Sequence, residues 1–151
     1  MKVAEALQLR ADLNRRIAQL GERLSSNAIV QEGESTAEDP KELIRELDES
    51  IQMLEKLMCR INLTNARTRQ GEKSVTELIA HRDALRLKIE RYRSLIAAAS
   101  QCAYRASRTE IKILPAVDVK ALQKTLDAMA KDYRETDNAI QALNWSTDLL
   151  E

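Results

Sequence analysis

Apolar residues recur at alternating intervals of three and four positions along most of this chain. The pattern is longest in the final stretch, which carries Val119, Leu122, Leu126, Met129, Tyr133, Thr136, Ile140, Leu143, Thr147 and Leu150. This spacing places one stripe along an α-helix and is typical of a coiled-coil seam. Phe is absent, aromatic residues make up 3%, and there are only 3 Gly and 2 Pro. Because residues that favour strands and tight turns are scarce, the sequence predicts an all-α fold.

The spacing predicts four long antiparallel helices in a single domain covering residues 1–151. They span about residues 3–25, 40–68, 75–103 and 119–150. Asp39, Ser74 and Asp118 each stand where a polar side chain caps a helix start, and Asp39 precedes a proline suited to the first helical position. The first helix has an expected seam of Val3, Ala6, Arg10, Leu13, Ile17, Leu20 and Leu24. In the second helix the expected seam is Ile44, Leu47, Ile51, Leu54, Met58, Ile61 and Asn65. In the third it is Leu78, Arg82, Leu85, Ile89, Tyr92, Ile96 and Ala99.

Two segments between the helices break the helical period. Residues 28–38 contain an apolar–polar fragment before a loop, and Glu110–Ile113 alternates with β-branched residues ahead of Pro115. If successive helices alternate in direction, these two connections lie at the same end. We expect Ile29–Glu32 and Glu110–Ile113 to form a short two-stranded β-ribbon there. The N-terminus, the turn at Gly71 and the C-terminus then gather at the other end.

Four polar residues occupy positions in the expected seams. They are Arg10, Asn65, Arg82 and Thr136. Because a buried arginine without a partner is costly, we expect Arg10 and Arg82 to pair with acids across helices, with another subunit as the favoured source. Polar seam residues commonly fix register and subunit number, and we prefer that role to ligand binding. A chain this polar buries little apolar surface alone, so a closed homo-oligomer is expected, with a dimer the commonest form.

A second polar group gathers near the ends of the second and fourth helices. Its members are Asn62, Thr64, Asn65, Arg67, Arg69, Asn144 and Trp145. Amide and guanidinium donors beside an indole can bind an anion or a nucleotide. They can equally cap helices and close a subunit contact, which is the interpretation we prefer.

Patterns for catalysis and metal binding are missing from the sequence. His81 is the only histidine, and neither Cys59 nor Cys102 stands in a nucleophile or metal-ligand motif. Glu77 and His81 lie four residues apart and can share a metal, but a surface hydrogen bond or ion pair is the preferred interpretation. The glycines are isolated, so no phosphate-binding loop is predicted. We expect no enzymatic activity, no cofactor and no metal.

Charge is balanced overall but unevenly distributed. There are 24 acidic and 24 basic residues, with acids dominating residues 32–55 and bases dominating residues 60–112. We interpret this as neighbouring helices with complementary faces. The zero net charge argues against a dedicated nucleic-acid-binding protein, although the Arg-rich second half keeps that function as an alternative. No signal peptide or spanning segment is recognisable, which predicts a cytoplasmic protein.

Short local sequences along the whole chain form a specific combination. They are Met1-Lys2 with Ala4-Glu5-Ala6-Leu7, Arg10-Ala11-Asp12-Leu13, Asn27-Ala28, Val30-Gln31-Glu32-Gly33-Glu34, Glu38-Asp39-Pro40, Arg60-Ile61-Asn62, Thr64-Asn65, Arg82-Asp83 with Leu85, Glu110-Ile111-Lys112, Val117-Asp118-Val119 and Asn144-Trp145 with Thr147. In this combination the chain resembles a small, largely uncharacterised bacterial family called septicolysin-like. This resemblance implies a helical, oligomeric fold and carries over no catalytic residue, while the family name implies a cytolysin.

The leading functional hypothesis is a non-enzymatic coiled-coil protein that assembles with itself and scaffolds an unidentified protein partner. The alternative is a membrane-active protein, as the family name implies. That alternative requires exposed apolar faces, whereas the expected seams are narrow and flanked by charge.

Overall fold

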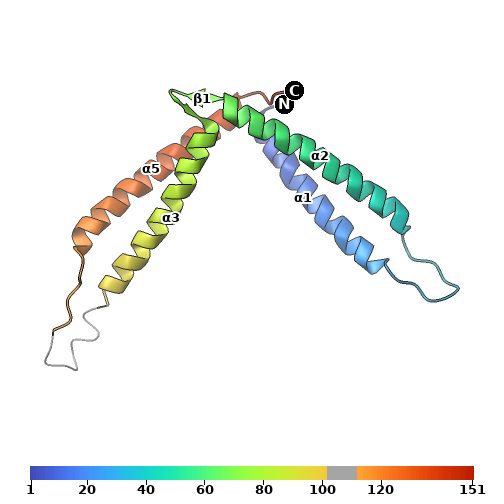
Figure 1. Ribbon diagram of the computed structural model, residues 1–151, viewed down its shortest axis with the longest axis horizontal. Coiled ribbons are helices and arrows are strands. Elements are labelled where there is room, and N and C mark those ends of the chain that lie inside the picture. Colours follow the sequence, from blue (N-terminus) through green and yellow to red (C-terminus); the bar gives the residue numbers. More distant parts are fainter. Residues whose placement is uncertain (102–111) are drawn as a thin grey trace. The chain divides into compact units, whose positions relative to one another are not determined.

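The computed structural model describes residues 1–101 and 112–151. Within them the chain forms four α-helices and one two-stranded ribbon (Figure 1): α1 Val3–Ser26, α2 Pro40–Arg67, β1 Arg69–Gln70, β2 Lys73–Ser74, α3 Val75–Ala99 and α5 Val119–Ser146. The all-α fold with a short ribbon is therefore confirmed. α5 ends four residues before the expected position, and the expected end of the third helix at residue 103 lies outside the described residues.

The chain divides into two units. The first unit comprises Met1–Ser74 and Leu143–Glu151, and the second comprises Val75–Ala142. That the two units form a single domain stays a prediction. None of the helices within the described residues is both long and apolar enough to cross a membrane.

In the first unit, α1 and α2 form an antiparallel hairpin whose core reaches the C-terminal segment. The buried cluster consists of Val3, Ala6, Leu13, Leu57, Ile61 and Leu149. The α1 seam is buried at Val3, Ala6, Leu13 and Leu20, as its spacing predicts. Arg23 near the end of α1 pairs with Glu38 ahead of α2, and this ion pair lowers the pKa of the Glu38 carboxyl. The hairpin is therefore held by an apolar seam and an ion pair beside its loop.

The buried face of α2 differs from the expected one. Its fully buried residues are Leu43, Ser50, Leu57, Ile61 and Thr64. Ile44, Ile51 and Met58 are instead 48%, 45% and 43% exposed. The expected and observed seams share Leu47, Leu54 and Ile61, so the helix is rotated by about one position toward Leu43 and Leu57. The prediction was wrong because α2 carries two adjacent apolar stripes, and spacing alone does not say which of them faces α1.

The two hydroxyl residues in the observed α2 seam are compatible with burial because their polar groups are bonded within the helix. Ser50 Oγ donates to the carbonyl of Glu46, and Thr64 Oγ1 donates to the carbonyl of Arg60; the donor–acceptor distance is 2.7 Å in both hydrogen bonds. Satisfying these hydroxyls locally avoids the cost of burying an unpaired polar group. Small hydroxyl side chains therefore occupy two positions of the observed seam, where the sequence pattern predicts the neighbouring Ile51 and Asn65.

The two-stranded ribbon lies between α2 and α3, not where we expected it. β1 pairs antiparallel with β2 through Arg69 and Ser74 and through Gln70 and Lys73. Gly71 has a φ of 61°, which suits the first position of a two-residue hairpin loop. Ile29–Glu32 forms no strand, and Glu110 and Ile111 lie outside the described residues. A loop of two residues closes at a much lower entropic cost than pairing segments about 80 residues apart, which explains the location.

In the second unit, α3 and α5 form the other hairpin, and its seam follows the expected register. Leu85, Ile89, Leu126 and Met129 make the buried cluster. Tyr92 and Tyr133 pack against it as half-buried seam residues. Because each of these helices has only one continuous apolar stripe, the spacing was enough to identify the buried face.

Polar caps define where the helices begin. Asp39 accepts a hydrogen bond from the Lys41 amide at 3.0 Å, and Asp118 Oδ1 accepts one from the Ala121 amide at 3.0 Å. Ser74 directly precedes α3. The structure thus confirms Asp39 and Asp118 as caps and places Ser74 at the expected position.

Replacing Asp39 with alanine should lower the free energy of unfolding by about 1 kcal/mol, because the first turn of α2 loses its side-chain acceptor. A loss of about the same size is expected for Ser74→Ala. Glu34→Ala is the matched control, since it removes an exposed acid from the preceding loop. Urea denaturation followed by circular dichroism measures the difference, and equal stabilities of Asp39→Ala and Glu34→Ala would contradict the cap.

Candidate functional site

The face of α2 beside its buried seam carries alternating apolar and acidic residues. Ile44, Asp48, Ile51, Glu55 and Met58 follow one another at intervals of four, three, four and three residues, and all five are exposed. Residues at this spacing share one face of a helix. Neither acid forms an ion pair within the described part of the chain. We call these five residues the α2 stripe.

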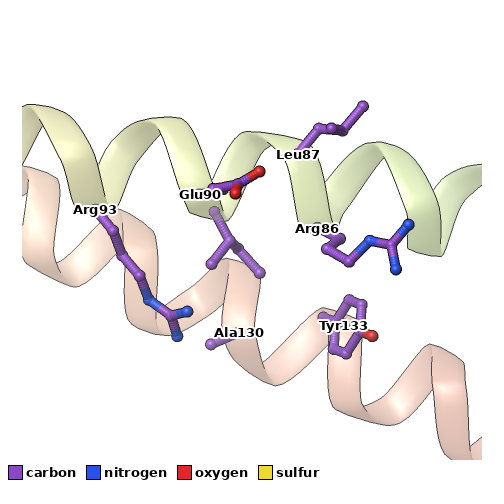
Figure 2. Close-up of a pocket in the computed structure, with 7 residues that line it drawn as sticks. Arg86, Leu87, Glu90, Arg93, Ala130 and Tyr133 are labelled. Atoms are coloured by element: carbon purple, nitrogen blue, oxygen red, sulfur yellow. The ribbon is translucent and has the colours of Figure 1, made fainter.

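A basic groove lies between α3 and α5 in the second unit. It is an open hollow of about 690 Å³, lined in part by Arg86, Ile89, Arg93, Ala130 and Tyr133. Figure 2 shows Arg86 and Arg93 extending from α3 toward Tyr133 and Ala130 on α5. Ile89 is buried, Ala130 and Tyr133 are half-buried, and both arginines are exposed. The floor of this α3–α5 groove is therefore apolar and partly aromatic, with guanidinium groups along one edge.

The charges around the α3–α5 groove leave both arginines available. Glu90 also lines the hollow and lies between them on α3. Neither Arg86 nor Arg93 forms an ion pair in residues 1–101 and 112–151. An exposed guanidinium with no carboxylate partner suits a bidentate contact with an acid from elsewhere.

Arg82 makes the expected pairing across helices, but its acidic partners lie in the same chain. Its guanidinium is 3.1 Å from Asp137 on α5 and 2.9 Å from Asp83 on α3. Burial alone would lower the pKa of Arg82, but hydrogen bonds to the two carboxylates outweigh it and raise the pKa. An acidic partner from another subunit is not needed for Arg82, because α5 supplies the acid within the hairpin.

Thr136 belongs to a second polar cluster across the same hairpin. It is 8% exposed, and its hydroxyl lies 3.2 Å from Asp132 Oδ1. The other oxygen of Asp132 is 3.0 Å from His81 Nε2. His81 therefore bonds to an acid on α5, which fits the non-metal interpretation of this histidine. Within the described residues, no three His, Cys, Asp or Glu side chains are grouped as a metal site.

The remaining two register candidates do not form buried polar pairs. Arg10 is exposed and makes no ion pair in the described ranges, so its expected pairing with an acid from another subunit stays a prediction. Its long side chain reaches solvent from a seam position, which removes the need for a buried partner. Asn65 is half-buried beside the observed α2 seam.

The two chain ends meet the end of α2 in the first unit (Figure 1). The Val3 amide donates to the Thr147 carbonyl at 3.0 Å, and the Leu149 amide donates to the Met1 carbonyl at 2.8 Å. The Leu150 amide then donates to Thr64 Oγ1 at 3.0 Å. We call this set of contacts the terminal clasp. Its position confirms the expectation that both termini gather beside the connection between α2 and α3.

Side chains of Arg60 and Lys2 reinforce the terminal clasp. Arg60 Nε donates to the Leu150 carbonyl at 2.6 Å. The Lys2 ammonium lies 2.9 Å from Asp148 and 3.1 Å from the Ser146 carbonyl. Sequence reasoning missed all of these partners, because neither a hydrogen bond to a distant backbone carbonyl nor an ion pair between opposite ends of the chain leaves a local motif.

The expected polar end cluster is only partly assembled. Thr64 is buried in the terminal clasp, and Asn144 is also buried. Arg69 donates to the Glu72 carbonyl within the ribbon loop. The remaining exposed members are Asn62, Arg67 and Trp145. Asn62 and Arg67 are five residues apart on α2, so they do not share one face of that helix. The contacts of Thr64 support a structural role for this residue, and ligand binding by the other members stays untested.

The terminal clasp should loosen in acid. The Lys2 ammonium holds the pKa of Asp148 below its ordinary value of 3.8. Because the pKa of Asp148 is lower in the folded than in the unfolded chain, the ion pair stabilises the fold fully at pH values above the ordinary pKa. This stabilisation is lost as the pH falls through the lowered pKa. Trp145, the only tryptophan, should report the change by fluorescence during acid titration. Asp148→Asn should lack this component, and identical titrations of the two proteins would contradict the assignment.

The chain is similar to a protein of known structure and to a protein family. A crystal structure of a functionally unknown conserved protein from Corynebacterium diphtheriae is similar, with 38% sequence identity and a TM-score of 0.89 over 99% of each chain. No curated protein matches the chain. A family model described as a family of unknown function, DUF6847, matches residues 10–149. Because the match covers nearly the whole sequence, the chain belongs to the DUF6847 family.

Proposed function

We propose that this chain is a non-enzymatic, cytoplasmic scaffold that assembles with further copies of itself through the α2 stripe. The observation that carries the proposal is the exposure of Ile44, Ile51 and Met58 at seven-residue intervals beside a seam that is already buried. Isolated exposed apolar residues are ordinary on a protein surface, but an apolar row in heptad register is typical of a second helix-packing face.

The polar residues of the helices support a structural role. Arg82 bonds to Asp83 and Asp137, while His81, Asp132 and Thr136 bond to one another across the α3–α5 hairpin. Groups joined in this way fix the register of two helices. These residues therefore hold the α3–α5 hairpin together, and association takes place through the α2 stripe.

The acids of the α2 stripe favour assembly over the membrane-active alternative. Asp48 and Glu55 alternate with the three apolar residues on the same face. A helix that lies in a membrane surface usually has basic residues beside its apolar face, because they attract anionic lipids. Acids in this position oppose such binding, and they suit a basic protein surface instead.

Replacing Ile51 with aspartate should weaken self-association by at least about tenfold, because a charge would have to be buried at the centre of the contact. Gln52→Asp is the matched control, since it adds the same charge one residue away on an exposed position. Sedimentation velocity over a concentration series measures association, and circular dichroism checks that both variants remain folded. Equal association of the two folded variants would exclude the α2 stripe as the contact.

A further inference from the structure

We propose that the α2 stripe of one copy docks into the α3–α5 groove of a second copy, with Asp48 and Glu55 paired to Arg86 and Arg93. This inference rests on the proposed self-assembly and identifies the surface that receives the stripe. The occupant of the groove is thus a helix from the same protein. Helix-in-groove recognition uses apolar anchors along one helix face, with charged residues at the edges of the contact.

Charge disfavours the simplest alternative, in which two α2 stripes pack against each other. A parallel arrangement in register would bring Asp48 against Asp48 and Glu55 against Glu55. An antiparallel arrangement centred on Ile51 would bring Asp48 of one copy beside Glu55 of the other. Like charges directly opposed across a contact are unfavourable, and neither acid has a basic partner in the described part of its own chain to offset this. We therefore expect the α2 stripe to dock on a basic surface.

The α3–α5 groove has that charge at a matching spacing. Asp48 and Glu55 are seven residues apart on α2, and Arg86 and Arg93 are seven residues apart on α3. Seven helical residues correspond to a rise of roughly 10.5 Å. Two helices that cross at the shallow angle of about 20° typical of coiled coils can therefore form both carboxylate–guanidinium pairs at once.

The apolar parts of the two surfaces also correspond. Ile51 lies midway between the two acids of the stripe, and it is 45% exposed. On the receiving side, the small side chain of Ala130 and the ring of Tyr133 form the groove floor, with Arg86 and Arg93 extending over them (Figure 2). In knobs-into-holes packing a side chain of one helix enters a hole between residues of the facing helix, and the short side chain of Ala130 leaves room for Ile51. Docking would thus cover Ile51 while the acids meet the arginines.

Two oppositely charged double variants test the docking directly. The first, Arg86→Glu with Arg93→Glu, keeps an acidic stripe and makes the groove acidic. The second, Asp48→Arg with Glu55→Arg, keeps a basic groove and makes the stripe basic. Each variant alone should associate at least about tenfold more weakly than the natural sequence, because its two docking surfaces carry like charge. An equimolar mixture should recover association, since each stripe then finds a groove of opposite charge on the other variant.

The controls separate docking from general charge effects. Lys88→Glu with Arg91→Glu makes the same charge change on exposed α3 positions that do not line the groove, and it should leave association unchanged. Arg86→Gln with Arg93→Gln removes the positive charges without adding repulsion and serves if the glutamate variant fails to fold. Sedimentation velocity at fixed salt measures every sample, and circular dichroism checks folding.

The outcomes distinguish this inference from the proposed function. Recovery in the mixture, with weak association of each variant alone, supports docking of stripe into groove between copies. If Ile51→Asp dissociates the protein but the groove variants associate normally, the docking proposal is overturned while self-assembly stands. Weak association that mixing does not restore also overturns it. If the natural sequence never associates, the proposed function itself fails.

Discussion

Replacing Leu149 with alanine should lower the free energy of unfolding by about 2–5 kcal/mol, although this residue lies beyond the last helix, near the end of the chain. Its side chain is 6% exposed and belongs to the same buried cluster as Val3, Ala6, Leu57 and Ile61. Truncation removes buried methyl groups and leaves a cavity between α1 and α2. The terminal clasp holds the backbone at this point, so the surrounding residues have little freedom to collapse into the space.

Leu63→Ala is the control for this prediction. Leu63 lies on α2 in the same unit and is 48% exposed, so its truncation should cost well under 1 kcal/mol. Urea denaturation of both variants by circular dichroism gives the comparison. If Leu149→Ala were as stable as Leu63→Ala, the C-terminal segment would not be part of the core of the first unit.

Removing the Arg82 side chain should lower the free energy of unfolding by about 1–2 kcal/mol. Its guanidinium bonds to Asp137 on α5 and Asp83 on α3, and its side chain is 24% exposed. Arg82→Ala leaves two carboxylates close together without their shared cation. The figure is below the cost of breaking a fully buried pair, because water reaches the carboxylates and screens their repulsion.

Arg91→Ala is the matched control for Arg82→Ala. Arg91 lies on the same helix, is exposed and forms no ion pair in the described residues, so its loss should change stability by no more than about 0.5 kcal/mol. A double-mutant cycle with Asp137→Asn isolates the contact across the hairpin. Additive effects in that cycle would show that Arg82 and Asp137 do not interact in solution.

The fold could be predicted from the sequence to the extent that each helix had a single apolar stripe. α3 and α5 meet that condition, and their seam was identified residue by residue. α2 does not, because Leu43 and Leu57 compete with Ile44 and Met58 for the position beside Leu47, Leu54 and Ile61. The choice depends on how α1 packs against it, which no local pattern contains. Local pattern also did not decide where the ribbon forms, because it did not show that two strands joined by a two-residue loop would pair in preference to two segments far apart in the sequence.

The residues of the candidate site likewise divide into those that could be predicted from the sequence and those that could not. Arg82 and Thr136 were identified because a polar residue in an apolar seam is conspicuous. Arg86 and Arg93 were not, because they lie outside the seam, where arginine is ordinary, and only the neighbouring helix makes them one edge of a groove. The terminal clasp was missed for a different reason: two of its hydrogen bonds join backbone groups at opposite ends of the chain, and the third joins the Leu150 amide to the distant Thr64 hydroxyl.

Sedimentation equilibrium of the natural sequence at micromolar concentrations tests the central claim most directly. We expect a mass of at least twice the chain mass, and a shift toward the monomer mass for Ile51→Asp under the same conditions. A folded natural protein that remained at the monomer mass across the concentration range would contradict self-assembly through the α2 stripe.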